Sequence, residues 1–315
     1  MTTTESPIMV QERRRVGRGL GWAVLSAASF GLSGALAKSL LEIGWSPGAV
    51  VLVRIAGAFA ALLIPCLVLL RHVGLPKAAD TRRMVAYGVV AVALAQLCYF
   101  SAVQYLSVGV ALLLEYTAPV LLIGWQWWRS KVLPRRAVFL GAAIAMAGMV
   151  LVLDIVHGFT LDPVGVLWGL GAAVCLTVYF LLSADSGSDS AASIPPLLMT
   201  TVGTGVGSVV LVLAGVTGVV PMAFELADTQ LAGVVVSWWV PVLMLILITA
   251  ALAYLTGIVA VRRLGSSIAS FVALSEVLFA VTFAALLLGQ QPTLLQAAGG
   301  VLVLVGIATV QRPSR

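Results

Sequence analysis

The sequence has few charged side chains, too few to cover a surface that faces water. Only 10% of its 315 residues are charged, whereas 61% are hydrophobic and the mean hydropathy is +1.11. Soluble globular chains carry about 25% charged and roughly 45–50% apolar residues. This shortage argues against a soluble enzyme, a nucleic-acid-binding domain and a disordered scaffold. It predicts an integral membrane protein that has the lipid bilayer as a partner and binds no nucleic acid.

Histidine and cysteine are also scarce. The two histidines, His72 and His157, lie far apart in connecting segments, so we expect no metal site and no cofactor. Cys66, Cys98 and Cys175 fall inside apolar runs, and an odd number of such cysteines argues against a disulfide framework. No Walker, HExxH, GxSxG or CxxC motif is present. We therefore expect a protein that is not an enzyme and that draws any energy it uses from a gradient.

The apolar residues gather into ten runs of about 18–25 residues, the length at which a helix crosses a hydrocarbon core of about 30 Å. Their connections are short, except around 220–236. There, apolar residues alternate with Glu225, Asp228 and Gln230, which favours a short interfacial helix. The runs are 19–40, 47–70, 84–104, 108–128, 136–154, 164–183, 195–219, 237–261, 266–289 and 293–310.

Basic residues are distributed unevenly among the connections. With a cytoplasmic N-terminus, sixteen of the eighteen Lys and Arg residues fall in cytoplasmic segments and none in outer loops, as the positive-inside rule requires. Only Lys38 and Arg54 lie within apolar runs. The partition predicts ten transmembrane helices with both termini in the cytoplasm. The excess of Arg over Lys is typical of a GC-rich bacterial gene, so we expect a multi-pass protein of the bacterial plasma (inner) membrane.

The two halves of the sequence repeat each other. A proline and two glycines near the fifth run recur 158 residues later: Pro134, Gly141 and Gly148 match Pro292, Gly299 and Gly306. Five helices are an odd number, so the second half would insert upside down. Inverted repeats with a site between them near the midplane are a recurring plan of secondary transporters. The glycines would also let the fifth and tenth helices pack closely, within one chain or in a homodimer.

The predicted fold is thus an all-α integral membrane protein built from two inverted five-helix repeats. The expected segments are a cytoplasmic N-terminal tail at 1–18, a first repeat at 19–154, an external connection at 155–163, a second repeat at 164–310 and a cytoplasmic C-terminal tail at 311–315.

Two stretches resemble a known family. Residues 110–120, Val-Ala-Leu-Leu-Leu-Glu-Tyr-Thr-Ala-Pro-Val, resemble the fourth helix of threonine/homoserine exporter-like proteins. Residues 274–280 and 286–292 resemble the ninth helix of EamA-type carriers of the drug/metabolite transporter superfamily. The sequence departs from that family at Gln290, where Glu is usual, and at Val277, where Pro is frequent. The resemblance spans nearly the whole chain and implies a ten-helix exporter.

Four charged side chains fall in the interior of the apolar runs, away from their end residues: Lys38, Arg54, Glu115 and Glu276. A charge at the bilayer centre costs roughly 2.5–3.5 kcal/mol on insertion scales, so each should face protein or a wet cavity. Lys38 lies near the outer end of its run, where it would either snorkel to the interface or join a binding site. Arg54 and Glu115 lie at one level. They would either form a packing ion pair or bind the carboxylate and the ammonium of a zwitterion.

Glu276 lies near the midplane without a charged counterpart in its own half. It is either a buried packing group or a group that couples transport to protons or binds substrate. Pro119 should leave the carbonyl oxygen of Glu115 without its helical donor, which would add an acceptor for an ammonium. Pro119 is also a candidate hinge, together with Pro65 and Pro241.

Polar side chains elsewhere in the runs are candidates to line a substrate cavity, although helix packing would explain them as well. These candidates are Ser33, Gln96, Tyr99, Tyr179 and Tyr254. With the intramembrane charges, they favour a secondary carrier that exports small-molecule metabolites, above all amino acids or related zwitterions, by alternating access. An exporter of lipophilic drugs or cations is the alternative, and a non-transporting membrane protein is a third.

Overall fold

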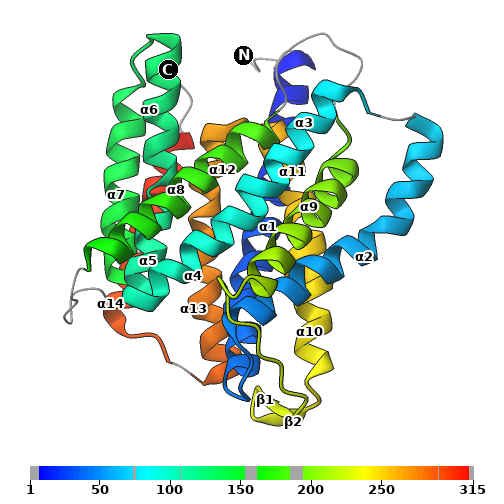
Figure 1. Cartoon of the computed structure of the whole chain (residues 1–315). Helices are drawn as coiled ribbons and strands as arrows, with labels where there is room; N and C mark the ends of the chain where they lie inside the picture. Colours follow the sequence, from blue (N-terminus) through cyan, green and yellow to red (C-terminus); the bar gives the residue numbers. More distant parts are fainter. Residues whose placement is uncertain are drawn as a thin grey trace.

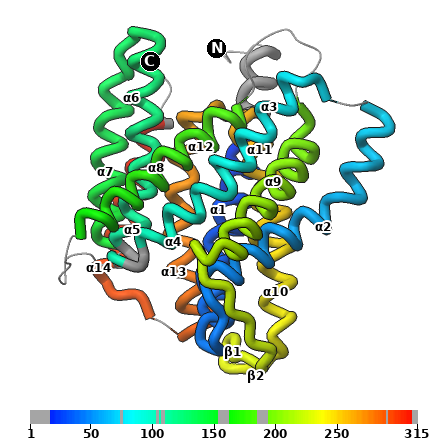
Figure 2. Tube along the Cα trace, in the orientation of Figure 1, coloured from blue at the N-terminus to red at the C-terminus, as the bar shows by residue number. Residues whose placement is uncertain are grey.

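The computed structural model describes residues 7–73, 76–106, 108–152, 162–184, 194–289 and 291–311. Most of the expected external connection at 155–163 lies outside this part, as do the ends of both expected tails. The chain forms a bundle of helices in which α1 begins and α14 ends at the same end of the molecule (Figure 1). The path of the chain through the bundle can be followed in Figure 2.

The first half of the chain forms five helical segments, of which two contain a break or a change of helix type. They are α1 (Pro7–Leu41), α2 (Pro47–Val73), α3 (Ala78–Ala86) continuing through the π-helix η1 (Tyr87–Leu94) into α4 (Ala95–Tyr105), α5 (Val108–Glu115) with α6 (Ala118–Ser130), and α7 (Arg136–Val152).

The second half repeats this order. Its elements are α8 (Pro163–Ser183), α9 (Pro196–Val216), the strands β1 (Thr229–Leu231) and β2 (Val234–Val236), α10 (Trp239–Ile246) continuing through the π-helix η3 (Leu247–Leu252) into α11 (Ala253–Leu264), α12 (Ser266–Ala273) with α13 (Ser275–Leu288), and α14 (Leu294–Gln311).

Eight helical stretches in the described part of the chain are long and apolar enough to cross a membrane. They correspond to eight of the ten predicted runs. The fifth and tenth runs form shorter apolar helices, Arg136–Val152 and Leu294–Val310. The first helix is longer than expected, because α1 begins at Pro7 rather than at residue 19.

The irregularities of the two halves occur at equivalent places. At the offset of 158 residues, η1 corresponds to residues 245–252, which include all of η3. The Tyr116–Thr117 turn that separates α5 from α6 corresponds to Leu274–Ser275, where α12 gives way to α13. The repeat predicted from glycines and prolines thus extends to helix breaks that the sequence does not signal directly.

The glycines of the repeat bring α7 and α14 into backbone contact within one chain. A Cβ added at Gly148 would lie 2.7 Å from the carbonyl oxygen of Gly299, and one added at Gly299 would lie 2.7 Å from the carbonyl oxygen of Gly148. Gly141 and Gly306 approach each other in the same reciprocal way, also at 2.7 Å. Small residues at such positions are what allows two membrane helices to approach closely.

The interfacial helix predicted around 220–236 is wrong, because this segment ends in a β-hairpin. Strands β1 and β2 pair antiparallel, with Leu231 opposite Val234, around a turn of Ala232 and Gly233. Both turn residues have positive φ, 52° and 75°, the combination of a type I′ hairpin turn. Val234–Val236 is a run of β-branched residues, which favours a strand over a helix.

The hairpin lies at the end of the bundle opposite the described termini (Figure 1) and is tied to helices of both halves. The Thr229 hydroxyl donates to the carbonyl oxygen of Ser39 in α1 at 2.6 Å. The backbone amide of Ala232 donates to the carbonyl oxygen of Leu287 in α13 at 2.8 Å. The hairpin therefore spans the ends of α1 and α13.

Candidate functional site

The buried cation of the site is Arg54, in α2. Its side chain is 8% exposed, and its Nη2 donates to the backbone carbonyl of Thr249 at 2.9 Å. Thr249 lies in η3, and such π-turns are frequent at functional sites. The guanidinium also lies over the Phe30 ring, 5.7 Å from its centroid, in the geometry of a cation–π contact. Its buried Nε has no hydrogen-bond partner in the described structure, so one donor is left for another acceptor.

The two intramembrane carboxylates lie beside the two helix breaks. Glu115 is the last residue of α5, and Glu276 is in the first turn of α13. A carboxylate is favoured at the positive end of a helix and disfavoured at the negative end. Glu276 is therefore placed where the backbone supports its charge, whereas Glu115 lies at the negative end of α5, where an added cation would be stabilised. Both side chains are partly accessible.

The three charges act on one another without direct contact. The electrostatic neighbours of Arg54 include both Glu115 and Glu276. Within the described residues, no ion pair of 4.0 Å or less joins Arg54 to either carboxylate. The direct ion pair that the sequence offered as one interpretation of Arg54 and Glu115 does not form in this conformation. Because Arg54 and Glu115 do not contact each other, each of them can bind a charged group of a substrate.

Tyr116 links the two breaks. Its hydroxyl lies within hydrogen-bonding reach of the Glu276 carboxyl. Tyr116 stands in the turn between α5 and α6, and Glu276 follows the break before α13. Tyr116 is buried, and the sequence interpretation missed it. Two features of the sequence could have identified Tyr116 as a site residue: it directly follows Glu115, and it lies close to a proline.

Gly31 is a second residue that sequence reasoning missed. A Cβ at this position would lie 2.7 Å from the backbone carbonyl of Glu276 and 2.7 Å from the Cβ of Phe279. Only glycine lets α1 approach the start of α13 so closely. Gly31 therefore helps to fix the backbone that carries Glu276.

Aromatic side chains surround the charges. The Tyr254 ring meets the Phe30 ring edge-on at 5.1 Å between centroids, and it lies 6.3 Å from the Tyr179 ring. The Gln96 side chain lies within hydrogen-bonding reach of Tyr254. Tyr99 has Glu115 and Glu276 among its electrostatic neighbours. These side chains come from α1, α4, α8 and α11, so both halves of the chain contribute.

The structure thus brings most of the predicted site residues together, and places two elsewhere. Gathered around Arg54, Glu115 and Glu276 are Gln96, Tyr99, Tyr179 and Tyr254. Lys38 lies near the end of α1, where its side chain is 45% exposed and its Nζ is 3.9 Å from Glu42. This is the arrangement of an interfacial anchor. Ser33 is partly exposed on α1.

The candidate hinge prolines occupy three different settings. Pro119 is the second residue of α6, directly after the Tyr116–Thr117 turn. Pro65 lies inside an uninterrupted α2, and Pro241 is the third residue of α10. Of the three prolines, only Pro119 lies next to a helix break. That break, at Tyr116–Thr117, precedes Pro119 rather than beginning at it.

No metal centre is apparent in the described residues, where His, Cys, Asp and Glu side chains do not gather in groups of three or more. Two of the cysteines do meet. The thiols of Cys98 in α4 and Cys175 in α8 lie within hydrogen-bonding reach of each other. One comes from each half of the chain, and Glu115 is an electrostatic neighbour of Cys175.

A repeated family domain agrees with this two-part architecture. The profile of the EamA-like transporter family matches residues 17–154 and again residues 163–311. The chain belongs to the EamA-like transporter family. This places it in the drug/metabolite transporter superfamily and indicates a multi-pass membrane transporter rather than an enzyme.

The fold of this EamA-family chain also occurs in solved structures. One, described only as "Crystal structure of protein", is similar with a TM-score of 0.73 over 92% of this chain and 98% of that chain, at 19% sequence identity. At this identity the likeness shows the fold alone. No curated protein matches the chain.

Proposed function

We propose that this EamA-family transporter exports small metabolites, in particular amino acids or related zwitterions, by alternating access. The observation that carries the proposal is the buried Arg54 guanidinium, which keeps one Nε without a partner and stands near two carboxylates that it does not touch. A substrate with one carboxylate and one ammonium would complement both kinds of group.

The chemistry of each contact supports this assignment. Arg presents a planar fork of donors that suits a carboxylate, and such charge-assisted hydrogen bonds are among the strong ones. An ammonium would meet Glu115 at the negative end of α5 and would also relieve the repulsion between Glu115 and Glu276. The aromatic rings of Tyr254 and Tyr179 offer apolar surface for a side chain.

The repeat supports alternating access. Helices broken next to a central site are a recurring feature of transporters built from inverted repeats. Here the breaks at Tyr116–Thr117 and at Leu274 flank Glu115 and Glu276. We infer that the two halves rock about this region in a bilayer that all ten helical segments cross, with both termini in the cytoplasm. Export, a bacterial inner membrane and a threonine/homoserine-like substrate rest on the resemblance and on the distribution of Arg and Lys.

Glu276 is our candidate for proton coupling. It lies beside the second break, within hydrogen-bonding reach of Tyr116 at the first. A carboxyl group that gains or loses a proton here would alter the contact between the two halves.

The cluster also suits a second substrate class. Two carboxylates among tyrosine and phenylalanine rings would attract a lipophilic cation. Such a substrate would make no use of the unpartnered Nε of Arg54, which is why a zwitterion is preferred.

Reconstituted proteoliposomes distinguish these possibilities. We expect the protein to exchange labelled threonine, homoserine or an aromatic amino acid in counterflow, and its expression to protect a strain that is sensitive to toxic analogues of these compounds. Efflux of a cationic dye without movement of any amino acid would favour the drug-exporter alternative. If neither substrate class moves, the proposal fails.

A further inference from the structure

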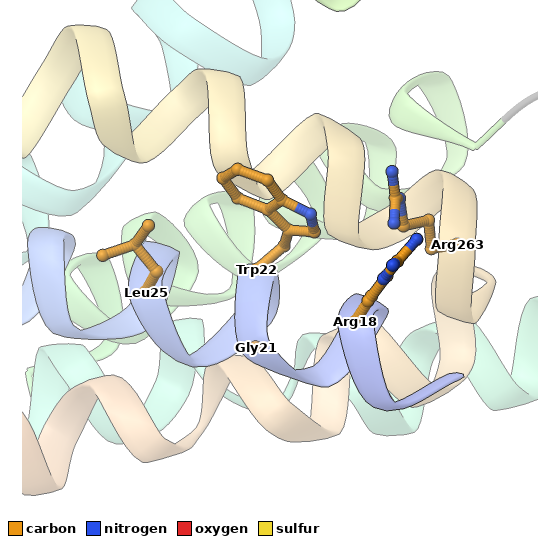
Figure 3. Close-up of a pocket in the computed structure, with 5 residues that line it drawn as sticks. All are labelled: Arg18, Gly21, Trp22, Leu25 and Arg263. Atoms are coloured by element: carbon orange, nitrogen blue, oxygen red, sulfur yellow. The ribbon is translucent and has the colours of Figure 1, made fainter. Parts of the chain in front are cut away.

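A groove lies between α1 and α11, away from the central charges. Its lining consists of Arg18, Gly21, Trp22 and Leu25 from α1 and Arg263 from α11 (Figure 3). The groove is shallow and open, with a volume of about 540 Å³. It lies at the end of the bundle where α1 begins and α11 ends (Figure 1).

Two glycines create this groove. A Cβ at Gly19 would lie 2.8 Å from Cδ2 of Leu264 and 3.0 Å from the Cβ of Arg263, so glycine there lets α11 approach α1. That approach brings Arg263 next to Arg18. At Gly21 the opposite holds, since a Cβ there would meet nothing within 4 Å. Gly21 thus leaves open the face of α1 on which Arg18, Trp22 and Leu25 succeed one another at helical spacing.

The charge of the groove is positive and uncompensated. Arg18 and Arg263 carry the charges among the five lining residues, and no acid is present there. Neither guanidinium donates a hydrogen bond or forms an ion pair in the described part of the chain. Figure 3 shows the two side chains, from the two helices that flank the groove, next to each other at one end of it. Two neighbouring cations without an acidic partner favour an anion.

The rest of the groove is apolar and faces outward. Trp22 is 37% exposed and Leu25 is 40% exposed, and both lie within the membrane-spanning stretch Gly17–Leu41. Tryptophan is enriched at the interface between lipid headgroups and hydrocarbon. The order along α1 is therefore a cation, an interfacial ring and an aliphatic side chain, which matches the order of groups along a phospholipid.

We propose that this groove binds an anionic phospholipid, with its phosphate on Arg18 and Arg263 and an acyl chain along Trp22 and Leu25. Basic pockets between transmembrane helices are known to bind the headgroups of anionic lipids. A soluble phosphate compound would meet the same two arginines but would leave the apolar half of the groove uncovered. This site is independent of the transported substrate.

Lipid titration of the purified full-length protein tests the proposal. Native mass spectrometry in detergent would measure the apparent affinity for phosphatidylglycerol and for phosphatidylcholine. We expect tighter binding of phosphatidylglycerol, and a loss of about 25-fold in the Arg18→Gln/Arg263→Gln double variant, since each cation near an anionic lipid contributes a factor of about five. The matched control is Arg82→Gln/Arg136→Gln, two exposed arginines outside the groove, which should bind phosphatidylglycerol as the native protein does.

Filling the groove is a second and independent test. Gly21→Leu should fold normally, because its side chain enters open space, and should weaken phosphatidylglycerol binding by displacing the acyl chain. Gly124→Leu is its control, since a Cβ at Gly124 also meets nothing within 4 Å. Unchanged phosphatidylglycerol affinity in the double arginine variant would overturn the proposal. Displacement of the lipid by an equimolar amount of glycerol 3-phosphate would instead assign the groove to a soluble anion.

Discussion

The Tyr116 hydroxyl and the Glu276 carboxyl lie within hydrogen-bonding reach of each other, and this contact joins the helix breaks of the two repeats. Tyr116 directly follows α5 in the first half, and Glu276 lies in the first turn of α13 in the second. The orientation of a membrane carboxylate in one half is thereby set by a side chain of the other half. We therefore expect a conformational change at one helix break to alter the other.

Removal of this hydroxyl should impair transport while the protein still folds. Hydrogen bonds to charged groups contribute about 1.5–3 kcal/mol, so Tyr116→Phe should lower the counterflow rate by at least about tenfold. The ring remains, and with it the packing. Tyr105→Phe, at an exposed position, is the control and should exchange at the native rate. Native activity in Tyr116→Phe would show that the bond has no role in the transport cycle.

Loss of the central cation should weaken recognition of a substrate carboxylate. Arg54→Gln should weaken amino-acid binding about tenfold to a hundredfold, by the same contribution of charged hydrogen bonds. Arg71→Gln, an exposed change in the last turn of the same helix, serves as the control. Binding is measured by isothermal titration of the purified protein. If the double variant Arg54→Met/Glu115→Leu transported as well as the native chain, the two residues would be a packing pair after all.

Glu276→Gln separates proton coupling from substrate exchange. Glutamine keeps the shape and the hydrogen bonding of the side chain but cannot titrate. We expect concentrative transport driven by a pH gradient to be lost, and counterflow exchange of labelled substrate to continue. Uptake into proteoliposomes with and without an imposed gradient measures the difference. A variant that still accumulates substrate against its gradient would remove Glu276 from the coupling step.

The Cys98–Cys175 contact provides a test of relative motion between the halves. A mild thiol oxidant would take two electrons and two protons from the facing thiols and join α4 to α8. We expect oxidation to stop transport, a reductant to restore it, and Cys175→Ala to be insensitive to both. Cys66→Ala, which leaves the pair intact, should remain sensitive. Full transport by fully cross-linked protein would mean that α4 and α8 do not separate in the cycle.

The glycine contact between α7 and α14 should be intolerant of even one methyl group. Overpacking of a tight contact costs roughly 1–3 kcal/mol, and a Cβ at Gly148 would lie 2.7 Å from the Gly299 carbonyl oxygen. Gly148→Ala should lower the thermal midpoint of the purified protein, whereas Gly124→Ala should not. Equal midpoints for these two variants would contradict the observed packing.

The charged residues of the site could be predicted because a charge within an apolar run is costly and therefore rare. Arg54, Glu115 and Glu276 stand out for that reason alone. The sequence could not show that Arg54 donates to the Thr249 carbonyl rather than to Glu115, because that choice depends on the π-turn of η3. The sequence did not identify Gly31 either, because the pattern of apolar residues around a glycine does not show which neighbouring helix it contacts.

The sequence predicted the elements that depend on the length and periodicity of apolar runs. It did not predict the elements that depend on the residues of a local turn. The order of helical segments follows from the apolar runs. The hairpin did not, because its acidic and apolar residues were interpreted with a helical period and the Ala232–Gly233 turn was overlooked. The break at Leu274 was hidden as well, since leucine is a good helix former and only the match to Tyr116 reveals the interruption.

The α7–α14 contact also limits how the molecule can move. Because four glycines bring the two backbones into contact, few side chains there can change conformation, and we expect this contact to stay closed. We therefore expect α7 and α14 to move as one unit, around which the other helices of the two repeats would rotate if the site is exposed to each face of the membrane in turn.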